Sequence, residues 1–162
     1  MQLKNRIAIV SGASKGLGKA IAVALVKKGV TVYGLARIEK HLMKVWEEVG
    51  ERFIPSTLDI TNQNSVNKWI YTTFTTANSP DIIINNAAIG SFGKIDEMAS
   101  NEWLAILQTN INGMYFLTKA VVPLLKNKKH TTHIINIGSI LKHNMRFMFW
   151  RRFIYKLWYL VS

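Results

Sequence analysis

The chain of 162 residues is 49% hydrophobic and 19% charged, which is the composition of a globular domain and not of a disordered chain. It contains no cysteine, which excludes a disulfide framework, a thiolate metal site and a cysteine nucleophile. Neither a signal-peptide core nor an uncharged apolar stretch of about 18 residues stands out, so we expect a cytoplasmic protein without a membrane span.

The net charge is +12, from 21 lysines and arginines against 9 acidic residues. Such an excess attracts the phosphate groups of nucleic acids, anionic lipids or phosphorylated cofactors. Residues 142–162 hold five basic residues, no acidic residue and seven aromatic residues. We therefore divide the chain into a domain of residues 1–141 and a basic, aromatic tail of residues 142–162.

Short apolar runs alternate with amphipathic segments along the first of these two parts. The runs predict strands at residues 6–10, 30–35, 52–58, 81–85 and 133–137. Apolar residues at helical spacing predict helices at residues 17–28, 39–50 and 62–76, and a helical pattern extends from 97 to 126. This alternation is typical of an α/β fold with a doubly wound, Rossmann-like parallel sheet.

Two details sharpen this prediction. Pro55 interrupts the third strand, which places that strand at a sheet edge or bends it before pairing begins. In the second helix, we expect Leu42, Val45, Trp46 and Val49 to face inward.

The segment between the first strand and the first helix carries glycines at three spaced positions. Gly12 allows a tight turn out of the strand, Gly16 lets the backbone approach a pyrophosphate, and Gly18 lets the helix pack closely. The free amide groups at the start of the helix then face the anion. The loop therefore predicts dinucleotide binding, with a glycine-rich turn that binds no ligand as the alternative.

A second feature selects between two dinucleotides. Arg37 follows the second strand at the place where proteins that bind NAD usually have an acidic residue, and its guanidinium group suits a 2′-phosphate. Lys15 adds a positive charge within the loop. The sequence thus favours NADP(H) over NAD(H), unless Arg37 is only a solvated surface charge.

Five segments resemble, in order and spacing, the motifs of the short-chain dehydrogenase/reductase family. They are Ser11-Gly12-Ala13-Ser14-Lys15-Gly16-Leu17-Gly18, Leu58-Asp59-Ile60, Asn85-Asn86-Ala87-Ala88, Asn110-Ile111-Asn112-Gly113 and Ile135-Asn136-Ile137-Gly138-Ser139. The first has Ser11 where the family has threonine, and the third has Ala88 where the family has glycine. The resemblance extends over residues 6–139, which are most of the chain.

The resemblance implies a cofactor site with residues from four segments. They are Gly12, Ser14, Lys15, Gly16, Leu17 and Gly18 around the pyrophosphate, Arg37 at the 2′-phosphate, Asp59 and Ile60 at the adenine, and Asn86, Ala87 and Ala88 toward the nicotinamide-side ribose. Two alternatives stay open, because Asp59 would also serve to cap the following helix and Asn86 to tie two strands together.

The resemblance also implies hydride transfer between nicotinamide and a carbonyl or alcohol substrate. Ser139 matches the residue that fixes the substrate oxygen, and Asn110 matches the residue that holds a water in the proton relay. The Tyr-x-x-x-Lys motif, expected about 11–14 residues after the serine, is missing from that window. Tyr155 lies slightly beyond it, with Tyr159 where lysine is required. The alternative for Ser139 is a hydroxyl that ends a strand and takes no part in catalysis.

The resemblance stops where the composition changes, so we expect a truncated or frameshifted chain whose Rossmann-like sheet is incomplete at its C-terminal side. The favoured function is an NADP(H)-dependent oxidoreductase with impaired catalysis, and the alternative is an inactive nucleotide-binding remnant. Binding of the tail to a membrane or nucleic acid is disfavoured, because the tail has no clean amphipathic face and no nucleic-acid signature.

The resemblance implies homo-oligomers through the helix that bears Asn110, an expectation weakened by the lack of a following helix. No metal site is expected, because His41, His130, His133 and His143 have no metal-ligand spacing with carboxylates.

Overall fold

The computed structural model describes residues 3–91 and 94–138 of the chain. Its strands are β1 (Ile7–Ser11), β2 (Thr31–Ala36), β3 (Phe53–Thr57), β4 (Ile82–Asn85) and β5 (His133–Asn136). Its α-helices are α1 (Gly16–Lys27), α2 (Glu39–Val49), α3 (Gln63–Thr73), α4 (Ser100–Leu107) and α5 (Met114–Lys126). A 3₁₀ turn, η1 (Ile95–Glu97), precedes α4, and a π-helix, η2 (Gln108–Gly113), joins α4 to α5.

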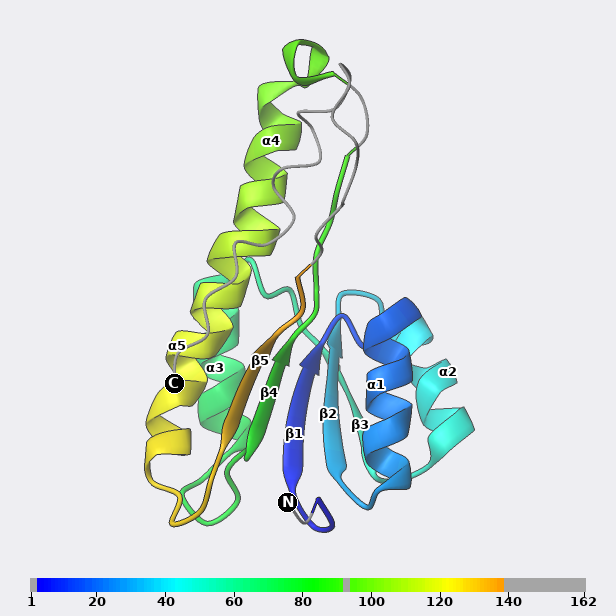
Figure 1. Ribbon diagram of the computed structural model, residues 1–162, viewed down its shortest axis with the longest axis vertical. Helices are drawn as coiled ribbons and strands as arrows, with labels where there is room; N and C mark the ends of the chain where they lie inside the picture. The colour runs from blue at the N-terminus through cyan, green and yellow to red at the C-terminus, as the bar shows by residue number, and fades with distance from the viewer. Residues whose placement is uncertain (1–2, 92–93, 139–162) are drawn as a thin grey trace.

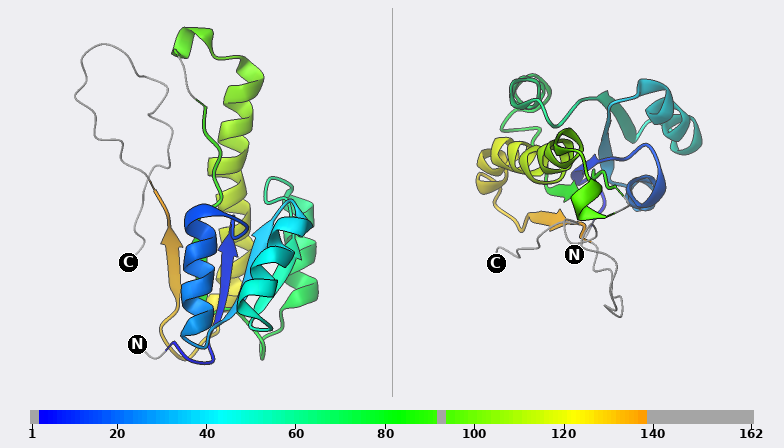
Figure 2. Two further views of the ribbon diagram at one scale, coloured as in Figure 1. Left: turned by 90° about the vertical axis from the view of Figure 1, so that its right-hand side faces the viewer. Right: turned by 90° about the horizontal axis from the view of Figure 1, so that it is seen from above.

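The five strands form one parallel sheet in the order β3-β2-β1-β4-β5. Helices α1 and α2 cover one face, and α3 and α5 cover the other (Figures 1 and 2). Within β1, Ala8 and Val10 pack toward α1 and α2, whereas Ile9 packs toward α3 and α5. Because both faces are covered there, β1, β2 and β4 are buried along nearly their whole length, whereas Ile134 and Ile135 of β5 are each 43% exposed. The predicted doubly wound fold is confirmed.

The edge position of the third strand is also confirmed. Among the described strands, β3 pairs with β2 alone, and Pro55 lies opposite Gly34 in that pairing. A proline has no N–H to donate, so it is tolerated at an edge and not in the middle of a sheet.

For one residue of α2, the predicted inward orientation is wrong. Leu42 and Val45 of α2 are buried and Val49 packs partly against the same core, but Trp46 is 38% exposed. The narrow stripe of α2 that faces the sheet is filled by the other three side chains. The large indole at the border of that stripe stays open to solvent.

The long helical pattern forms a nearly continuous rod. It begins at Ser100 and runs through α4, η2 and α5, with Pro123 inside the last turns. Its first part extends beyond the sheet, while α5 packs along it (Figure 1). None of the helices in the described part of the chain is long and apolar enough to cross a membrane.

A buried carboxylate ties the N-terminal ends of β1 and β4 together. Asp81 precedes β4, and its Oδ2 atom accepts a hydrogen bond of 2.7 Å from the backbone N–H of Ile7. Its Oδ1 atom lies 3.3 Å from Arg6 Nη1, 3.3 Å from Lys128 Nζ and 2.6 Å from His130 Nε2. Burial, the largest effect, raises the pKa of Asp81, but the hydrogen bonds from Ile7 and His130 and the charge of Lys128 outweigh it and leave this pKa below its usual value.

Replacing this carboxylate tests its contribution to folding. Because the pKa of Asp81 is lower in the folded chain than in the unfolded chain, its stabilisation is present at neutral pH and is lost as the pH falls below about 4. We expect Asp81→Asn to lower the free energy of unfolding by about 1–3 kcal/mol at pH 7, and by less in acid. Urea denaturation measures this difference. The exposed acid variant Glu51→Gln is the control, and an equal effect of both variants would contradict the prediction.

Candidate functional site

A cavity of about 450 Å³ lies at the C-terminal ends of the strands. The chain leaves β1 toward β2 on one side, while β4 leads to β5 on the other, so the order of the sheet reverses between β1 and β4. This switch point is the usual ligand site of an open parallel sheet. The cavity is lined by Gly12, Ser14, Lys15, Gly16, residues 35–38, His41, residues 58–61, residues 86–89 and Thr109.

The start of α1 forms one wall of the cavity. Its first turn contains no acidic residue, and the N-cap residue Lys15 makes no side-chain capping bond. The amide groups of the first turn have no acceptor within the helix, so they are available to an anion. Gly16 has a φ of +56°, and a Cβ atom at this position would meet no atom within 4 Å. The backbone of the loop is thus open toward the cavity.

The loop is held against the end of β4 by two polar side chains. The buried hydroxyl of Ser11 accepts hydrogen bonds of 3.0 Å from the backbone N–H groups of both Asn86 and Ala87, and it lies 3.3 Å from Ile84 O. The side-chain amide of Asn86 donates in return to the carbonyl oxygens of Ser11 and Gly12, at 3.1 and 3.3 Å. Asn86 therefore ties two strands together, as the alternative reading proposed, and it also lines the cavity.

Gly18 allows α1 to pack closely against the loop after β1 and the side chain of Asn86. A Cβ atom at Gly18 would lie 2.2 Å from Gly12 O and 2.3 Å from Asn86 Nδ2. Any larger residue would push α1 away from the loop, because backbone atoms cannot yield at such distances. Gly18 does not itself line the cavity, and neither does the 57% exposed Leu17. The other ten predicted cofactor residues do lie together around it.

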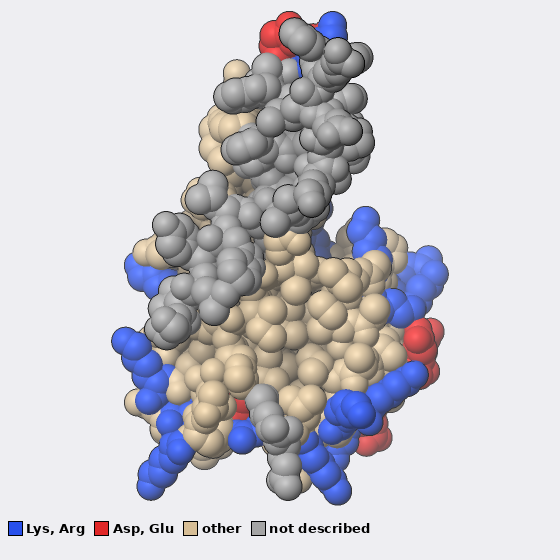
Figure 3. All heavy atoms as spheres, viewed as in Figure 1, with Lys and Arg blue, Asp and Glu red and all other residues tan. Residues whose placement is uncertain are grey.

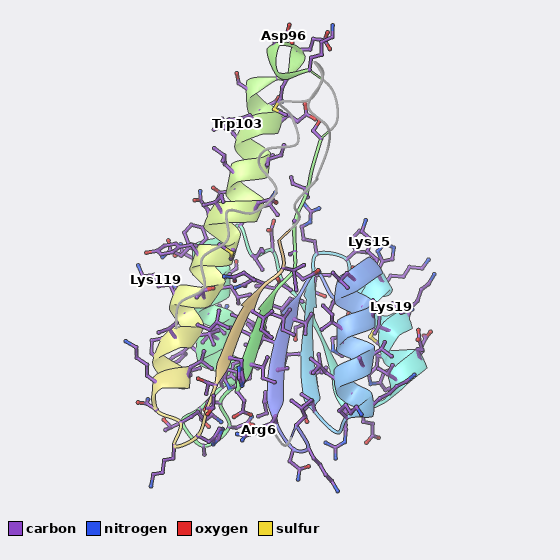
Figure 4. All side chains as sticks on the ribbon, in the orientation of Figure 1. Arg6, Lys15, Lys19, Asp96, Trp103 and Lys119 are labelled. Atoms are coloured by element: carbon purple, nitrogen blue, oxygen red, sulfur yellow. The ribbon has the colours of Figure 1, made fainter. Side chains whose placement is uncertain are left out.

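Two cationic side chains lie at the cavity, and neither has an ion-pair partner among the residues that the structure describes. Arg37 is exposed and follows β2, and Lys15 lies in the loop before α1, near the C-terminal edge of the sheet (Figure 4). Asp59 is the single acidic residue among those that line the cavity. The site therefore carries an excess of positive charge.

Asp59 organises the turn that follows β3. Its Oδ1 atom accepts hydrogen bonds from Thr61 N at 2.9 Å and Thr61 Oγ1 at 2.8 Å. The helix cap predicted as the alternative role belongs instead to Asn62, whose side chain accepts a bond from Ser65 N at the start of α3. The second carboxylate oxygen of Asp59 has no partner in the part of the chain that is described.

Asn110 fixes the segment after β4. This residue is fully buried in η2, where Oδ1 accepts a bond from Ile89 N and Nδ2 donates to Ile89 O, both at 2.9 Å. The paired bonds hold Ile89 at the edge of the cavity, which Thr109 also lines. The structure thus gives the side chain of Asn110 a positioning role, and the water-holding role stays a prediction. Ser139 and the tail of residues 142–162 lie outside the described residues.

Several lining residues lack a sequence signal of their own. Ile38, His41, Thr61, Ile89 and Thr109 reach the cavity because they neighbour the predicted residues in loops or on the first turns of helices. The rule that ligands bind beyond the carboxyl ends of parallel strands would have pointed to those in the loops.

One pair of residues has the spacing of the missing motif in the wrong place. Tyr115 and Lys119 lie four residues apart on α5, and Lys119 Nζ is 5.5 Å from the centre of the Tyr115 ring. Tyr115 is 53% exposed, and neither residue lines the cavity. Figure 4 shows Lys119 on the side of the molecule away from Lys15. This pair therefore does not supply the proton donor of the site.

Within residues 3–91 and 94–138, no group of three or more His, Cys, Asp or Glu residues is arranged to hold a metal ion. The chemistry that the cavity offers is that of anion binding by backbone amides, a guanidinium group and an ammonium group.

Replacing Ser11 tests whether its hydroxyl holds the loop after β1 against the end of β4. We expect Ser11→Ala to lower the free energy of unfolding by about 1–3 kcal/mol, because it removes the acceptor of the partly buried N–H groups of Asn86 and Ala87. Ser11→Thr keeps the hydroxyl and serves as the matched control. Urea denaturation followed by circular dichroism measures both variants. An unchanged midpoint for Ser11→Ala would show that the hydroxyl is not required.

Comparisons with a family profile and with known proteins point to the same family. The profile of the short chain dehydrogenases matches residues 6–150. The 3-oxoacyl-[acyl-carrier-protein] reductase of Vibrio harveyi is 36% identical over 140 residues, which are 86% of this chain and 57% of the relative. The reductase of the same name from Vibrio cholerae is 34% identical, with the same coverage.

Solved structures agree with this result. The 3-ketoacyl-(acyl-carrier-protein) reductase from Brucella melitensis, complexed with NADH, has a TM-score of 0.80 at 26% identity and covers 85% of this chain and 58% of its own. Serine dehydrogenase from Escherichia coli has a TM-score of 0.76 at 28% identity, over 82% of this chain and 61% of its own. This chain thus spans little more than half the length of these relatives. It belongs to the short-chain dehydrogenase family.

Proposed function

We propose that the chain binds a nicotinamide dinucleotide in the 450 Å³ cavity, with NADP(H) preferred over NAD(H), as a cytoplasmic oxidoreductase of the short-chain type. The observation that carries this proposal is the guanidinium of Arg37, which forms no ion pair within the described part of the chain and lies beside a cavity that the open start of α1 also lines. When bound, the cofactor would donate or accept the hydride exchanged with a carbonyl or alcohol carbon.

The residues present fit such a group from its adenine to the ribose on its nicotinamide side. The amides at the start of α1 would bind the pyrophosphate, and the open face of Gly16 leaves room for its oxygens. The second carboxylate oxygen of Asp59 would accept a hydrogen bond from the adenine amino group. Ala87 and Ala88, which follow Asn86 in the lining, would contact the ribose on the nicotinamide side.

The preference between the two cofactors rests on this chain's own charges. A 2′-phosphate beside Arg37 would receive charge-assisted hydrogen bonds, and Lys15 would add attraction. NADH lacks this phosphate and would leave the guanidinium in water. The Brucella melitensis relative was solved with NADH, so likeness to it does not decide the preference.

Removing the guanidinium tests the preference. We expect Arg37→Gln to weaken NADPH binding about tenfold, because a charge-assisted hydrogen bond is lost, and to leave NADH binding unchanged. Quenching of protein fluorescence during titration with each cofactor gives both dissociation constants. Lys40→Gln, which removes an exposed charge outside the cavity lining, is the control. Equal weakening of both cofactors by Arg37→Gln would overturn the assignment of Arg37.

We further propose that catalysis is impaired. In the proton transfer of this reaction class, an acid or base must lie within hydrogen-bonding reach of the substrate oxygen. The window after Ser139 has no tyrosine, and the pair Tyr115 and Lys119 lies outside the cavity. These observations favour the second candidate, a protein that binds the nucleotide without turning over a substrate.

An activity assay separates the two candidates. With NADPH and either a simple ketone or a 3-oxoacyl thioester, we expect saturable cofactor binding but NADPH oxidation at the background rate. The full-length reductase of Vibrio harveyi is the positive control for the assay. Turnover well above background that Ser139→Ala abolishes would establish an active enzyme and contradict the impaired-catalysis proposal.

A further inference from the structure

A second cavity lies at the opposite end of the sheet from the proposed dinucleotide site. It measures about 370 Å³ and includes Lys4, Arg6, Asp81, Lys128 and His130 in its lining. Arg6 and Asp81 directly precede β1 and β4, so this cavity opens at the N-terminal ends of these strands. Figure 4 shows Arg6 at the lower end of the sheet and Lys15 at the upper end.

The side chains of this cavity are arranged around one oxygen atom. Arg6 Nη1, Lys128 Nζ and His130 Nε2 all approach Asp81 Oδ1, at 3.3, 3.3 and 2.6 Å. The carboxylate is only 5% exposed, and its other oxygen accepts the N–H of Ile7. Asp81 therefore gathers the cationic groups at one place and presents little negative charge to the cavity.

The charges of the cavity do not balance. Lys4, Arg6 and Lys128 are basic residues of the lining, whereas Asp81 is its single acidic residue. Lys4 forms no ion pair within the described residues, and both Arg6 and Lys128 keep further N–H groups beyond those that face Asp81. The excess of two positive charges corresponds to a dianion. A guanidinium group beside ammonium groups is the donor set that phosphate prefers.

We propose that this cavity binds a phosphate dianion, either as the free ion or as the phosphate group of a small monoester. The surrounding surface would draw such an anion in. The loops that enter β1, β2, β3, β4 and β5, counted from the last residue of the preceding helix, hold eight lysines and arginines and two acidic residues. Figure 3 shows basic side chains along the lower border of the molecule. A field of one sign raises the local concentration of the opposite ion.

Titration of the full chain with inorganic phosphate, followed by ³¹P NMR in a buffer without phosphate or sulfate, tests the proposal. We expect saturable binding that Lys4→Gln and Lys128→Gln each weaken about tenfold, the loss of one charge-assisted contact. Lys4→Gln disturbs no ion pair of the described residues, so it should leave folding intact. Lys129→Gln, which removes the neighbouring exposed charge outside the lining, should bind as the unaltered chain does.

Two further arms locate and define the site. Saturating NADPH should leave phosphate binding unchanged, because the two cavities lie at opposite ends of the sheet. Glycerol 3-phosphate that displaces phosphate supports a monoester as ligand, and failure to displace it supports the free ion. Absence of saturable binding, or equal weakening by Lys129→Gln, would overturn the proposal. Since the variants of this cavity do not involve the cofactor, a failure of NADPH to bind would count against the proposed function alone.

Discussion

The site depends on one hydroxyl group, that of Ser11, at the point where the two halves of the sheet meet. β1 and β4 are neighbours in the sheet, but about seventy residues separate them along the chain. Ser11 accepts two N–H groups from the segment after β4, and Asn86 returns two bonds to the loop after β1. These bonds set the width of the crevice, so the same contacts that close the sheet also shape the cavity.

Most of the fold was predictable because its signals are local. The strands are four to six residues long and lie on the predicted runs, each helix has its own periodicity, and Pro55 alone indicated an edge. Ten of the twelve predicted cofactor residues line one cavity for a geometric reason. The carboxyl ends of parallel strands share one edge of the sheet, so residues that follow different strands meet there. Leu17 and Gly18 are the exceptions, since both lie within α1. Leu17 is on the exposed surface of the helix, and Gly18 allows the helix to pack closely against the loop.

The features that sequence reasoning missed all depend on contacts between distant segments. Nothing near Asn110 indicates that its amide would close on Ile89, and nothing near Asp81 indicates that Arg6 and Lys128 would converge on it. Trp46 was misplaced because periodicity gives the direction of a side chain but not the space available to it. Such outcomes depend on which loops the finished sheet brings together.

The π-helix η2 has a consequence for the rod that contains it. An α-helix turns about 100° per residue, and Leu125 follows Ile106 by 19 residues. In a regular helix, the side chain of Leu125 would therefore point about 100° around the axis from that of Ile106. The wider turn of η2 absorbs one residue, and the two side chains, both buried, come back onto one line. Asn110 lies within that wider turn. The same turn that keeps the buried side chains of α5 facing the sheet therefore also sets the direction of the Asn110 amide, which is hydrogen-bonded to Ile89.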